Sequence, residues 1–434
     1  MTTQSNSTDS RYSIMMISED EIRAAGAKDI KSAKHSNIVF ANLTVQQAEF
    51  LRQKGGEVVS LSHVKSNATG VITPPPPVTA VPTFTPEEFL SAAGLEALRN
   101  VTDPPLFGSG INIAVLGTGM RETHEQLKGR VIYSKNFTTS PDADVFDHDT
   151  GVASIIVSLA PQCGLLNFKV IDDNGEGSEE AVVMAIEECI DLHENLSPFA
   201  PNVINMSLGE VDDGNINNPL RVACRTAIHI GIWVFAAAGN SGPNHGTIMS
   251  PACEQYVFAT GSARYIPATK SFVVSQVSSR GPTLQGLTKP DVVLFGEDMI
   301  IASSQSDTAI TNKTGTSFTC PFAAGMGVIY LEGIARRAKT LVDLGQLPPA
   351  QFFFVPAEEV IDTQLPRICL RAAGMVGLKD NDYGYGLPFG PLISQNLATP
   401  TSVNLAGFGA ILPIMMIIPM LGGMMKSMMS QKAG

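Results

Sequence analysis

Short apolar runs alternate with helical patterns between residues 111 and 238. The apolar runs have the length of strands and are apolar throughout, and they cover residues 111–116, 165–171, 203–208 and 232–238. The helical patterns between them cover residues 151–159, 179–192 and 220–230. Strands that alternate with helices predict an α/β fold, a mostly parallel sheet with helices on both faces.

Three polar or small residues follow directly on the ends of expected strands. Gly117, Ser207 and Asn240 each lie just past an apolar run. Active sites of parallel sheets lie at the carboxyl ends of the strands. We therefore expect these three positions to lie close together, at one edge of the sheet.

Four motifs connect this edge to a known chemistry. They are His148-Asp-Thr-Gly-Val-Ala153, Val203-Ile-Asn-Met-Ser-Leu-Gly209, Ala236-Ala-Ala-Gly-Asn240 and Gly315-Thr-Ser-Phe-Thr-Cys-Pro321. In this order and spacing they resemble the subtilisin-like serine proteases (subtilases, peptidase S8) over about residues 90–395. The resemblance implies a subtilisin-like fold and hydrolysis of peptide bonds in a polypeptide substrate.

Acyl transfer at an amide needs an activated nucleophile, a base and donors for the oxyanion. The resemblance implies Ser317 as nucleophile, His148 as base and Asn240 as oxyanion donor. Each residue alone has a plainer interpretation, as a capping serine, a solvated histidine or a turn asparagine. The agreement of several motifs favours the catalytic interpretation. Five further residues match the family's substrate-lining positions: Ser207, Leu208, Gly209, Ala237 and Gly239.

Gly117 stands where the resemblance implies the third member of the triad, an aspartate. That acid orients the imidazole and stabilises the imidazolium, which glycine cannot do. Its loss costs on the order of 10⁴-fold in turnover, or roughly 5 kcal/mol of transition-state stabilisation. Two functions therefore follow: a strongly attenuated serine endopeptidase, or an inactive pseudoprotease that binds peptides or serves assembly.

Four aspartates near His148 are candidates to replace the missing acid. Asp147 and Asp149 flank the histidine, but neighbours in sequence are expected to project in different directions. Asp142 and Asp144 lie in the preceding loop and are freer to swing. Asp149 also stands where the family carries glycine, and we expect it to disturb tight packing beside the base.

The chain before residue 90 divides into three parts. We expect a flexible segment at residues 1–30, a prodomain-like α/β module at residues 31–68 and a proline-rich linker at residues 69–89. In the module, Thr44-Val-Gln-Gln47 matches a capping box, and residues 57–64 read as one strand. The resemblance implies that the module inhibits the domain at residues 90–398 and, without self-cleavage, stays tethered in its cleft.

Residues 399–434 form an apolar, methionine-rich tail. Residues 405–425 carry no charge and approach the length that a bilayer needs, although Pro413, Pro419 and several glycines weaken a helix. Three interpretations stay open: a membrane anchor, a partner-binding segment that makes homo-oligomers, and a disordered adhesive tail.

Composition excludes several other classes. A net charge of −12 opposes nucleic-acid binding. The polar start lacks the features of a secretory signal, which predicts a cytoplasmic protein. Six scattered cysteines form no pattern typical of zinc or disulfide frameworks. No acidic cluster has the spacing of a calcium loop, so we expect neither a metal nor a cofactor.

Overall fold

The computed structural model describes residues 9–66, 86–266, 268–343 and 355–398. The proline-rich linker falls almost entirely between the first two ranges, and the apolar tail follows the last. The predicted roles of the tail as anchor or oligomer contact therefore lie outside the described residues and stay predictions.

The central sheet has eight strands in the order β14-β13-β12-β10-β6-β8-β7, with β15 also paired to β13. All pairs are parallel except β13 with β14. This confirms the predicted mostly parallel sheet. The strands are β6 (Asn112–Gly117), β7 (Val131–Asn136), β8 (Gly164–Lys169), β10 (Val203–Met206), β12 (Trp233–Ala237), β13 (Phe258–Ile266), β14 (Ser271–Val274) and β15 (Val292–Phe295).

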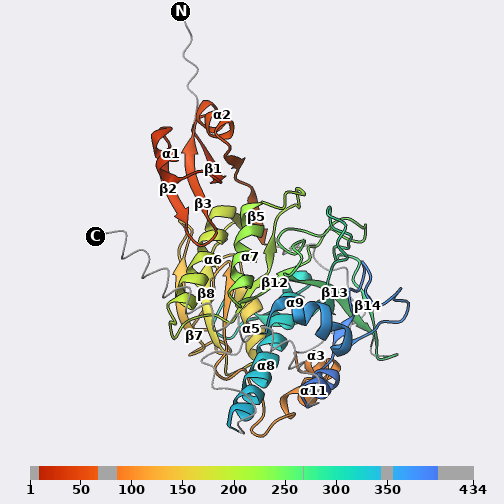
Figure 1. The fold of residues 1–434 in the computed structure, drawn as a ribbon. Coiled ribbons are helices and arrows are strands. Elements are labelled where there is room, and N and C mark those ends of the chain that lie inside the picture. The colour runs from red at the N-terminus through yellow and green to blue at the C-terminus, as the bar shows by residue number, and fades with distance from the viewer. Residues whose placement is uncertain (1–8, 67–85, 267, 344–354, 399–434) are drawn as a thin grey trace, which may run out of the picture.

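Helices cover both faces of the sheet, as expected (Figure 1). On the side of the N-terminal module, α6 (Glu179–Glu194) packs against α7 (Pro219–His229). On the other side, α5 (Asp149–Leu159) packs against α8 (Thr316–Asp343). Of the described helices, α8 alone is long and apolar enough to span a membrane, and 89% of its most apolar window is buried. It is therefore interpreted as a core helix.

The N-terminal module is larger than predicted. An antiparallel sheet in the order β2-β3-β1-β4 carries two helices and has its own apolar core. Its elements are β1 (Ser10–Met15), α1 (Glu19–Ala24), β2 (Lys28–Ala33), β3 (Ile38–Leu43), α2 (Val45–Gln53) and β4 (Glu57–Ser60). The prediction of a flexible segment at residues 1–30 was wrong for residues 9–30, because Tyr12 and Ile14 of β1 are buried in that core; residues 1–8 lie outside the described residues.

Two local predictions in the module had opposite outcomes. The capping box at Thr44 is confirmed, since Gln47 N donates to Thr44 Oγ1 at 3.2 Å and Thr44 N donates to Gln47 Oε1 at 2.8 Å. The single strand over residues 57–64 was wrong. The chain leaves the module after β4, and β5 (His63–Ser66) joins a different sheet with β9 (Glu176–Ser178) and β11 (Leu208–Gly209).

Shorter elements complete the large domain. In the loops after the sheet, β16 (Met299–Ala302) pairs with β17 (Ile310–Lys313), and β18 (Cys369–Leu370) pairs with β19 (Leu387–Pro388). The short helices are α3 (Pro86–Ala92), α4 (Leu95–Arg99), α9 (Ala357–Glu359), η1 (Val360–Gln364), α10 (Leu365–Ile368) and α11 (Gly390–Ala398). Since α3 begins at Pro86, the predicted linker ends before residue 89.

A buried charge cluster fixes the segment after β13. Lys289 Nζ donates to Asp291 Oδ2 at 2.7 Å, and Lys379 Nζ donates to Asp291 Oδ1 at 2.8 Å. Burial alone would raise the pKa of the Asp291 carboxyl, but the two lysines outweigh it and hold the pKa low. Asp291 directly precedes β15 and Lys379 lies in the C-terminal part of the domain, so the cluster ties the two together. Removing one partner of a buried ion pair is strongly destabilising.

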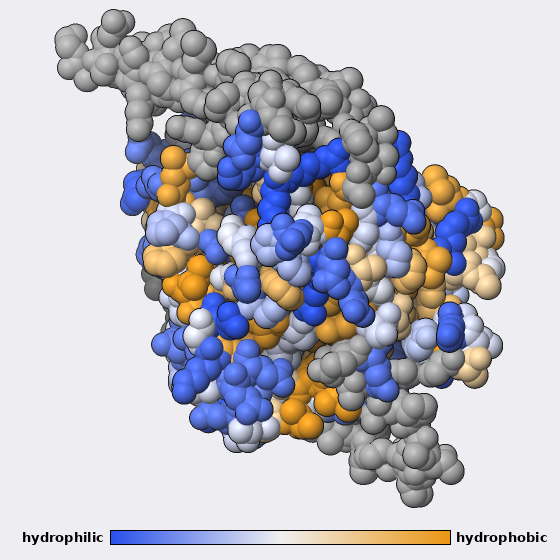
Figure 2. Space-filling model, turned by 90° about the horizontal axis from the view of Figure 1, so that it is seen from below, coloured by the Kyte–Doolittle hydropathy of each residue, from blue (hydrophilic) through white to orange (hydrophobic). Residues whose placement is uncertain are grey.

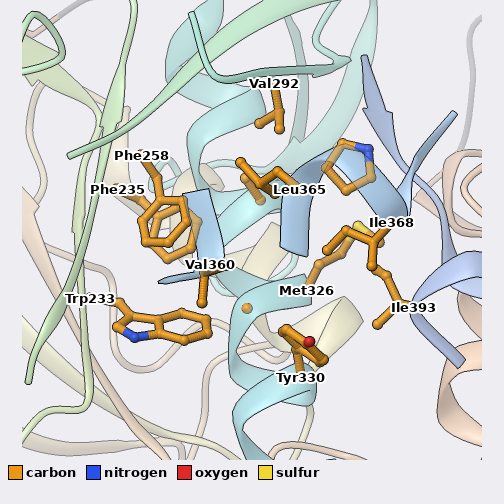
Figure 3. A pocket seen from close by; sticks show the side chains of 13 residues that line it. Trp233, Phe235, Phe258, Val292, Met326, Tyr330, Val360, Leu365, Ile368 and Ile393 are labelled. Carbon is orange, nitrogen blue, oxygen red and sulfur yellow. The ribbon is translucent and has the colours of Figure 1, made fainter. Parts of the chain in front are cut away.

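Two apolar features do not form sites. Trp233, Phe235 and Tyr330 lie around a partly open cavity of about 40 Å³ between the sheet, α8 and η1, which has room for little more than a water molecule (Figure 3). All six cysteine side chains are buried and unpaired.

On the face seen from below, hydrophilic and hydrophobic residues intermingle over the described surface (Figure 2).

Candidate active site

The predicted site residues gather at the carboxyl ends of the parallel strands. Gly117 ends β6, Ser207 directly follows β10, and Asn240 lies three residues past β12. β6 and β12 both pair with β10, so these three ends are adjacent. The predicted convergence of the motifs on one edge of the sheet is therefore seen in the structure.

Ser317 lies at the N-terminus of α8, as expected, and its side chain is buried. Its hydroxyl donates to the carbonyl of Ser207 at 3.3 Å, while the Ser207 hydroxyl donates to the carbonyl of Ser317 at 2.8 Å. This reciprocal contact joins the start of α8 to the segment after β10. A helix N-terminus favours negative charge that develops beside it.

Asn240 is oriented by the residue before Ser317. Its Oδ1 accepts from Thr316 N at 2.9 Å and from Thr316 Oγ1 at 3.0 Å. Thr316 Oγ1 also accepts from Gly239 N at 3.2 Å. Thr316, which the sequence analysis did not single out, therefore fixes the amide of Asn240 relative to the helix that carries Ser317.

His148 is the N-cap residue of α5 and is almost wholly buried. Its ring lies against Phe318, with ring centroids 5.5 Å apart. Phe318 directly follows Ser317, so this contact brings the His148 ring to the start of α8. Within the described residues, Nε2 of the ring has no hydrogen-bond partner.

The other ring nitrogen of His148 meets a carboxylate. Nδ1 lies 2.6 Å from Asp149 Oδ1, and Asp149 Oδ2 accepts from Thr118 N at 2.9 Å. The prediction that Asp149 would project away from its neighbour was wrong. His148 precedes the helix with φ −124° and ψ −58°, whereas Asp149 is its first helical residue, so the two side chains are not related by helical geometry.

Gly117 leaves the space that this carboxylate fills. A Cβ atom added at position 117 would lie 2.0 Å from Asp149 Oδ2 and 2.7 Å from Asp149 Cγ. Real Cβ atoms do not come so close to other heavy atoms. The expected disturbance of packing beside the base is not seen, because the missing side chain at position 117 makes room for the extra one at position 149.

The remaining aspartates of the loop have other partners. Asp144 Oδ1 accepts from His148 N at 3.2 Å, and Asp144 Oδ2 accepts from Thr150 N at 2.9 Å. Burial and the nearby charge of Asp149 raise the pKa of the Asp144 carboxyl. Asp144 therefore caps α5 and does not orient the ring.

Asp147 and Asp142 are directed away from His148 as well. Asp147 Oδ1 accepts from Ser304 N at 2.6 Å, and Asp142 Oδ1 accepts from Asn136 Nδ2 at 2.9 Å. Neither Asp142 nor Asp144, the two loop aspartates that are freer to swing, therefore bonds to the ring.

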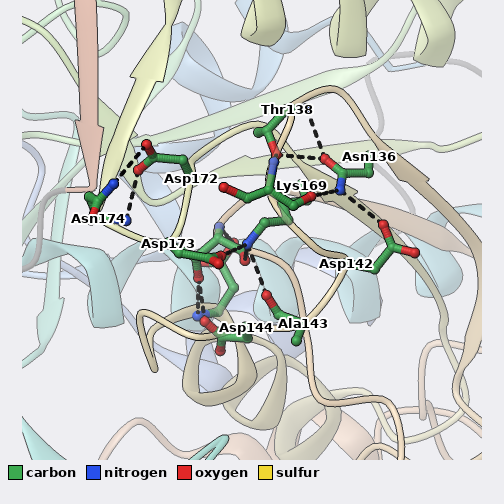
Figure 4. A network of polar contacts seen from close by, with 12 residues as sticks. Asn136, Thr138, Asp142, Ala143, Asp144, Lys169, Asp172, Asp173 and Asn174 are labelled. Carbon is green, nitrogen blue, oxygen red and sulfur yellow. Dashed lines mark hydrogen bonds and ion pairs between the residues drawn. The ribbon is translucent and has the colours of Figure 1, made fainter.

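A buried lysine holds the acidic loop against the sheet (Figure 4). Lys169 Nζ donates to Thr118 O at 2.8 Å, to Ala143 O at 2.9 Å and to Asp173 Oδ1 at 3.0 Å. Thr118 follows Gly117 and Ala143 precedes Asp144, so one ammonium group fixes the end of β6 relative to the loop that leads to His148.

An extended segment of the chain itself lies beside this site. β5 pairs antiparallel with β9 through Val64 and Lys65 and with β11 through Lys65 and Ser66. Leu208, the partner of Ser66, directly follows Ser207. The predicted lining residues Leu208 and Gly209 thus form one wall of a strand-shaped slot, which we call the β5 slot, while Ala237 and Gly239 lie at the end of β12.

Comparison with known proteins places this arrangement in a family. Residues 108–386 match the model of the subtilase family, peptidase S8. The chain belongs to the subtilases. Among the described residues, no group of three or more histidine, cysteine or acidic side chains could hold a metal ion.

Two relatives align with about half of this chain. Serine protease AprX of Bacillus subtilis (strain 168) is 29% identical over 267 residues, 55% of this chain and 60% of that protein. Subtilisin of Bacillus sp. (strain TA39) is 30% identical over 239 residues, 50% of this chain and 56% of that protein. The chain therefore spans less than two thirds of the length of these relatives.

A solved structure shows the same fold. Fervidolysin from Fervidobacterium pennivorans, a keratinolytic enzyme related to subtilisin, superposes with a TM-score of 0.65 at 18% identity. The match covers 89% of this chain and 61% of that one. At this identity the likeness supports the subtilisin-like fold of the chain.

Two buried carboxylates border the β5 slot in this subtilase. Glu179 N donates to Ser62 O at 3.4 Å, and the Ser62 hydroxyl donates to Glu210. Burial, and then repulsion from Glu210, raise the pKa of Glu179 to about 8. The folded protein therefore holds a proton on Glu179 that the unfolded chain releases at lower pH.

This raised pKa makes stability depend on pH. Between the ordinary pKa of 4.5 and the folded value of about 8, the folded state binds more protons, so the free energy of unfolding falls as pH rises. The slope is at most about 1.4 kcal/mol per pH unit. We expect Glu179→Gln to make this decline shallower in urea denaturation between pH 5 and 8, whereas Glu96→Gln, at an exposed position, leaves its slope unchanged. Equal slopes for the two variants would contradict the assignment.

Proposed function

We propose that the chain is a serine endopeptidase with a complete triad, in which Asp149 takes the role of the strand-borne aspartate. Ser317 is the nucleophile, His148 the general base, and Asn240 with the Ser317 backbone N–H supplies the oxyanion donors. One observation carries the proposal: His148 Nδ1 lies 2.6 Å from the buried carboxylate of Asp149.

The contact supports each task of a triad acid. A carboxylate at Nδ1 fixes the tautomer with its proton there, which leaves Nε2 as the acceptor for the serine proton. Within the described residues Nε2 has no competing partner. The same carboxylate stabilises the imidazolium that forms during attack. Its second oxygen accepts from Thr118 N at 2.9 Å, which holds the group in place.

The Ser317 hydroxyl must leave its present acceptor to join this pair. Its hydroxyl donates to Ser207 O at 3.3 Å in the present structure, and attack requires its proton to face Nε2. Catalytic hydrogen bonds often form only once substrate is bound. The carbonyl carbon of the scissile bond then accepts Ser317 Oγ, the oxyanion meets the two donors, and His148 returns the proton to the leaving amine.

Attenuation by Gly117 and complete loss of activity were the two expectations from sequence. Both assumed that no carboxylate reaches the ring, and the Asp149 contact supports a working triad instead. Peptide binding without cleavage remains a second candidate function, because the chain's own β5 fills the β5 slot. A fluorophosphonate probe separates them: the endopeptidase is labelled at Ser317 and the Ser317→Ala variant is not, whereas a binding module is never labelled.

One prediction concerns the proposed acid. We expect Asp149→Asn to lower kcat on the order of 10⁴-fold with little change in KM, because the ring loses its tautomer control while the peptide contacts remain. Hydrolysis of an internally quenched peptide measures both constants. Asp142→Asn is the matched control, since Asp142 lies in the same loop but bonds Asn136. Equal losses in the two variants would argue against a triad role for Asp149.

Another prediction concerns the shared space of positions 117 and 149. Gly117→Asp alone should lower activity, because its Cβ would lie 2.0 Å from Asp149 Oδ2. Asp149→Gly alone should lower activity on the order of 10⁴-fold, because the site then has no acid.

The double variant Gly117→Asp/Asp149→Gly should recover most of the original kcat/KM, since it exchanges the two residues. The combined loss would then be far smaller than the sum of the single losses in a double-mutant cycle. An increase in activity with Gly117→Asp alone would mean that the site lacks an acid, and would sink the proposal.

A further inference from the structure

The side chains of β5, and of Ser62 directly before it, alternate between the floor and the mouth of the β5 slot. Ser62 and Val64 face inward, and Val64 is wholly buried in the large hydrophobic core. His63 and Lys65 face outward and are exposed. This is the period of two that an extended segment imposes. Backbone pairing holds any such segment, and the side-chain environments select among sequences.

The mouth of the slot is acidic where Lys65 lies. Lys65 Nζ is 2.8 Å from Glu176 Oε1, and the two residues are direct partners across the β5–β9 pair. The side chains are 62% and 46% exposed, so the pair is solvated and contributes modestly. An acidic residue in place of Lys65 would meet repulsion there.

The floor of the slot carries two more carboxylates where Ser62 lies. Glu179 and Glu210 are 1% and 4% exposed. In the described part of the chain no salt bridge joins either one to a basic side chain. Leu220 N donates to Glu179 Oε1 at 3.4 Å, and Asn218 Nδ2 donates to Glu210 Oε1 at 2.9 Å. Burial raises the pKa of both carboxyls. A hydroxyl or a cation suits this place, and a third carboxylate does not.

The acidic character continues along α6, beneath the module. Glu180 pairs with Arg11 at 2.7 Å and with Lys31 at 2.9 Å. Glu187 accepts from the backbone N–H of His35 at 2.8 Å. The module thus presents donors and cations to the large domain, and the same helix that supplies Glu179 supplies their acceptors (Figure 1).

We propose that the β5 slot selects extended segments with a basic residue at the position of Lys65, a hydroxyl or basic residue at the position of Ser62 and a small aliphatic residue at the position of Val64. Glu176, Glu179 and Glu210 determine this preference. The consequence of this preference rests on the proposed function, since the preference names the segments that the endopeptidase cleaves. Acidic segments are rejected.

Binding is measured first, so that the preference is tested apart from cleavage. The full chain carries Ser317→Ala to prevent hydrolysis and Val64→Asp to weaken its own β5, with Val64→Gly as a second variant should the first not fold. Fluorescent peptides with the sequence of residues 60–72 are titrated by anisotropy. Because the tethered β5 competes equally with every peptide, the ratios of Kd values do not depend on it.

The expected ratios follow from the contacts. The change Lys65→Glu in the peptide should weaken binding about fivefold, and Ser62→Asp about 100-fold or more. A peptide with Ser62→Lys should bind at least as well as the parent peptide. Glu176→Lys in the protein should reverse the order of affinity, so that the Lys65→Glu peptide binds more tightly than the parent peptide. Glu96→Lys, the same change in charge on α4, should leave the order of affinity unchanged.

Two failures are distinguishable. Equal Kd values for the parent peptide and its Lys65→Glu form, or no binding of any peptide, would overturn the preference. If the ranking holds but the chain with an intact Ser317 cleaves none of these peptides and is not labelled by fluorophosphonate, the endopeptidase proposal fails and the slot remains a selective binding site for basic segments.

Discussion

Positions 117 and 149 share one small volume beside His148, and the rest of the site is arranged around that volume. A Cβ at position 117 would lie 2.0 Å from Asp149 Oδ2, so only one of the two positions can contribute a carboxylate. The carboxylate comes from α5, while β6 contributes the backbone N–H of Thr118, which bonds its second oxygen. The loop before α5 is correspondingly fixed, by Asp144 at the helix start and by Lys169 against the sheet.

The second feature of the molecule is that the site and an extended occupant belong to one chain. The module is joined to the β5 slot by the short segment between β4 and β5 and docks on the acidic side of α6. A tether of this kind keeps the local concentration of the occupant high, on the order of millimolar. An external segment that entered the β5 slot would therefore compete with β5 and would meet the same three glutamates.

The sheet and the gathering of the motifs were predictable from sequence, because strand and helix periods are local and the carboxyl ends of parallel strands meet at one edge. Other features depend on context that a pattern does not carry. The orientation of Asp149 depends on the non-helical backbone of His148. The break between β4 and β5 depends on pairing with β9 and β11, residues more than a hundred positions away. β2 escaped prediction because its exposed face is rich in lysine and its inward residues are few.

The adjacency of His148 and Asp149 in sequence also has a mechanical meaning. When base and acid are carried by different elements, any sliding of a helix against the sheet changes the distance between them, and thermal motion continually alters their hydrogen bond. Here both residues sit at one end of α5 and move together as that helix moves. The remaining adjustable distance is the one between α5 and α8, which pack against each other. Fluctuations of the sheet therefore change the distance between the serine and the histidine, and they leave the distance between the histidine and the Asp149 carboxylate unchanged.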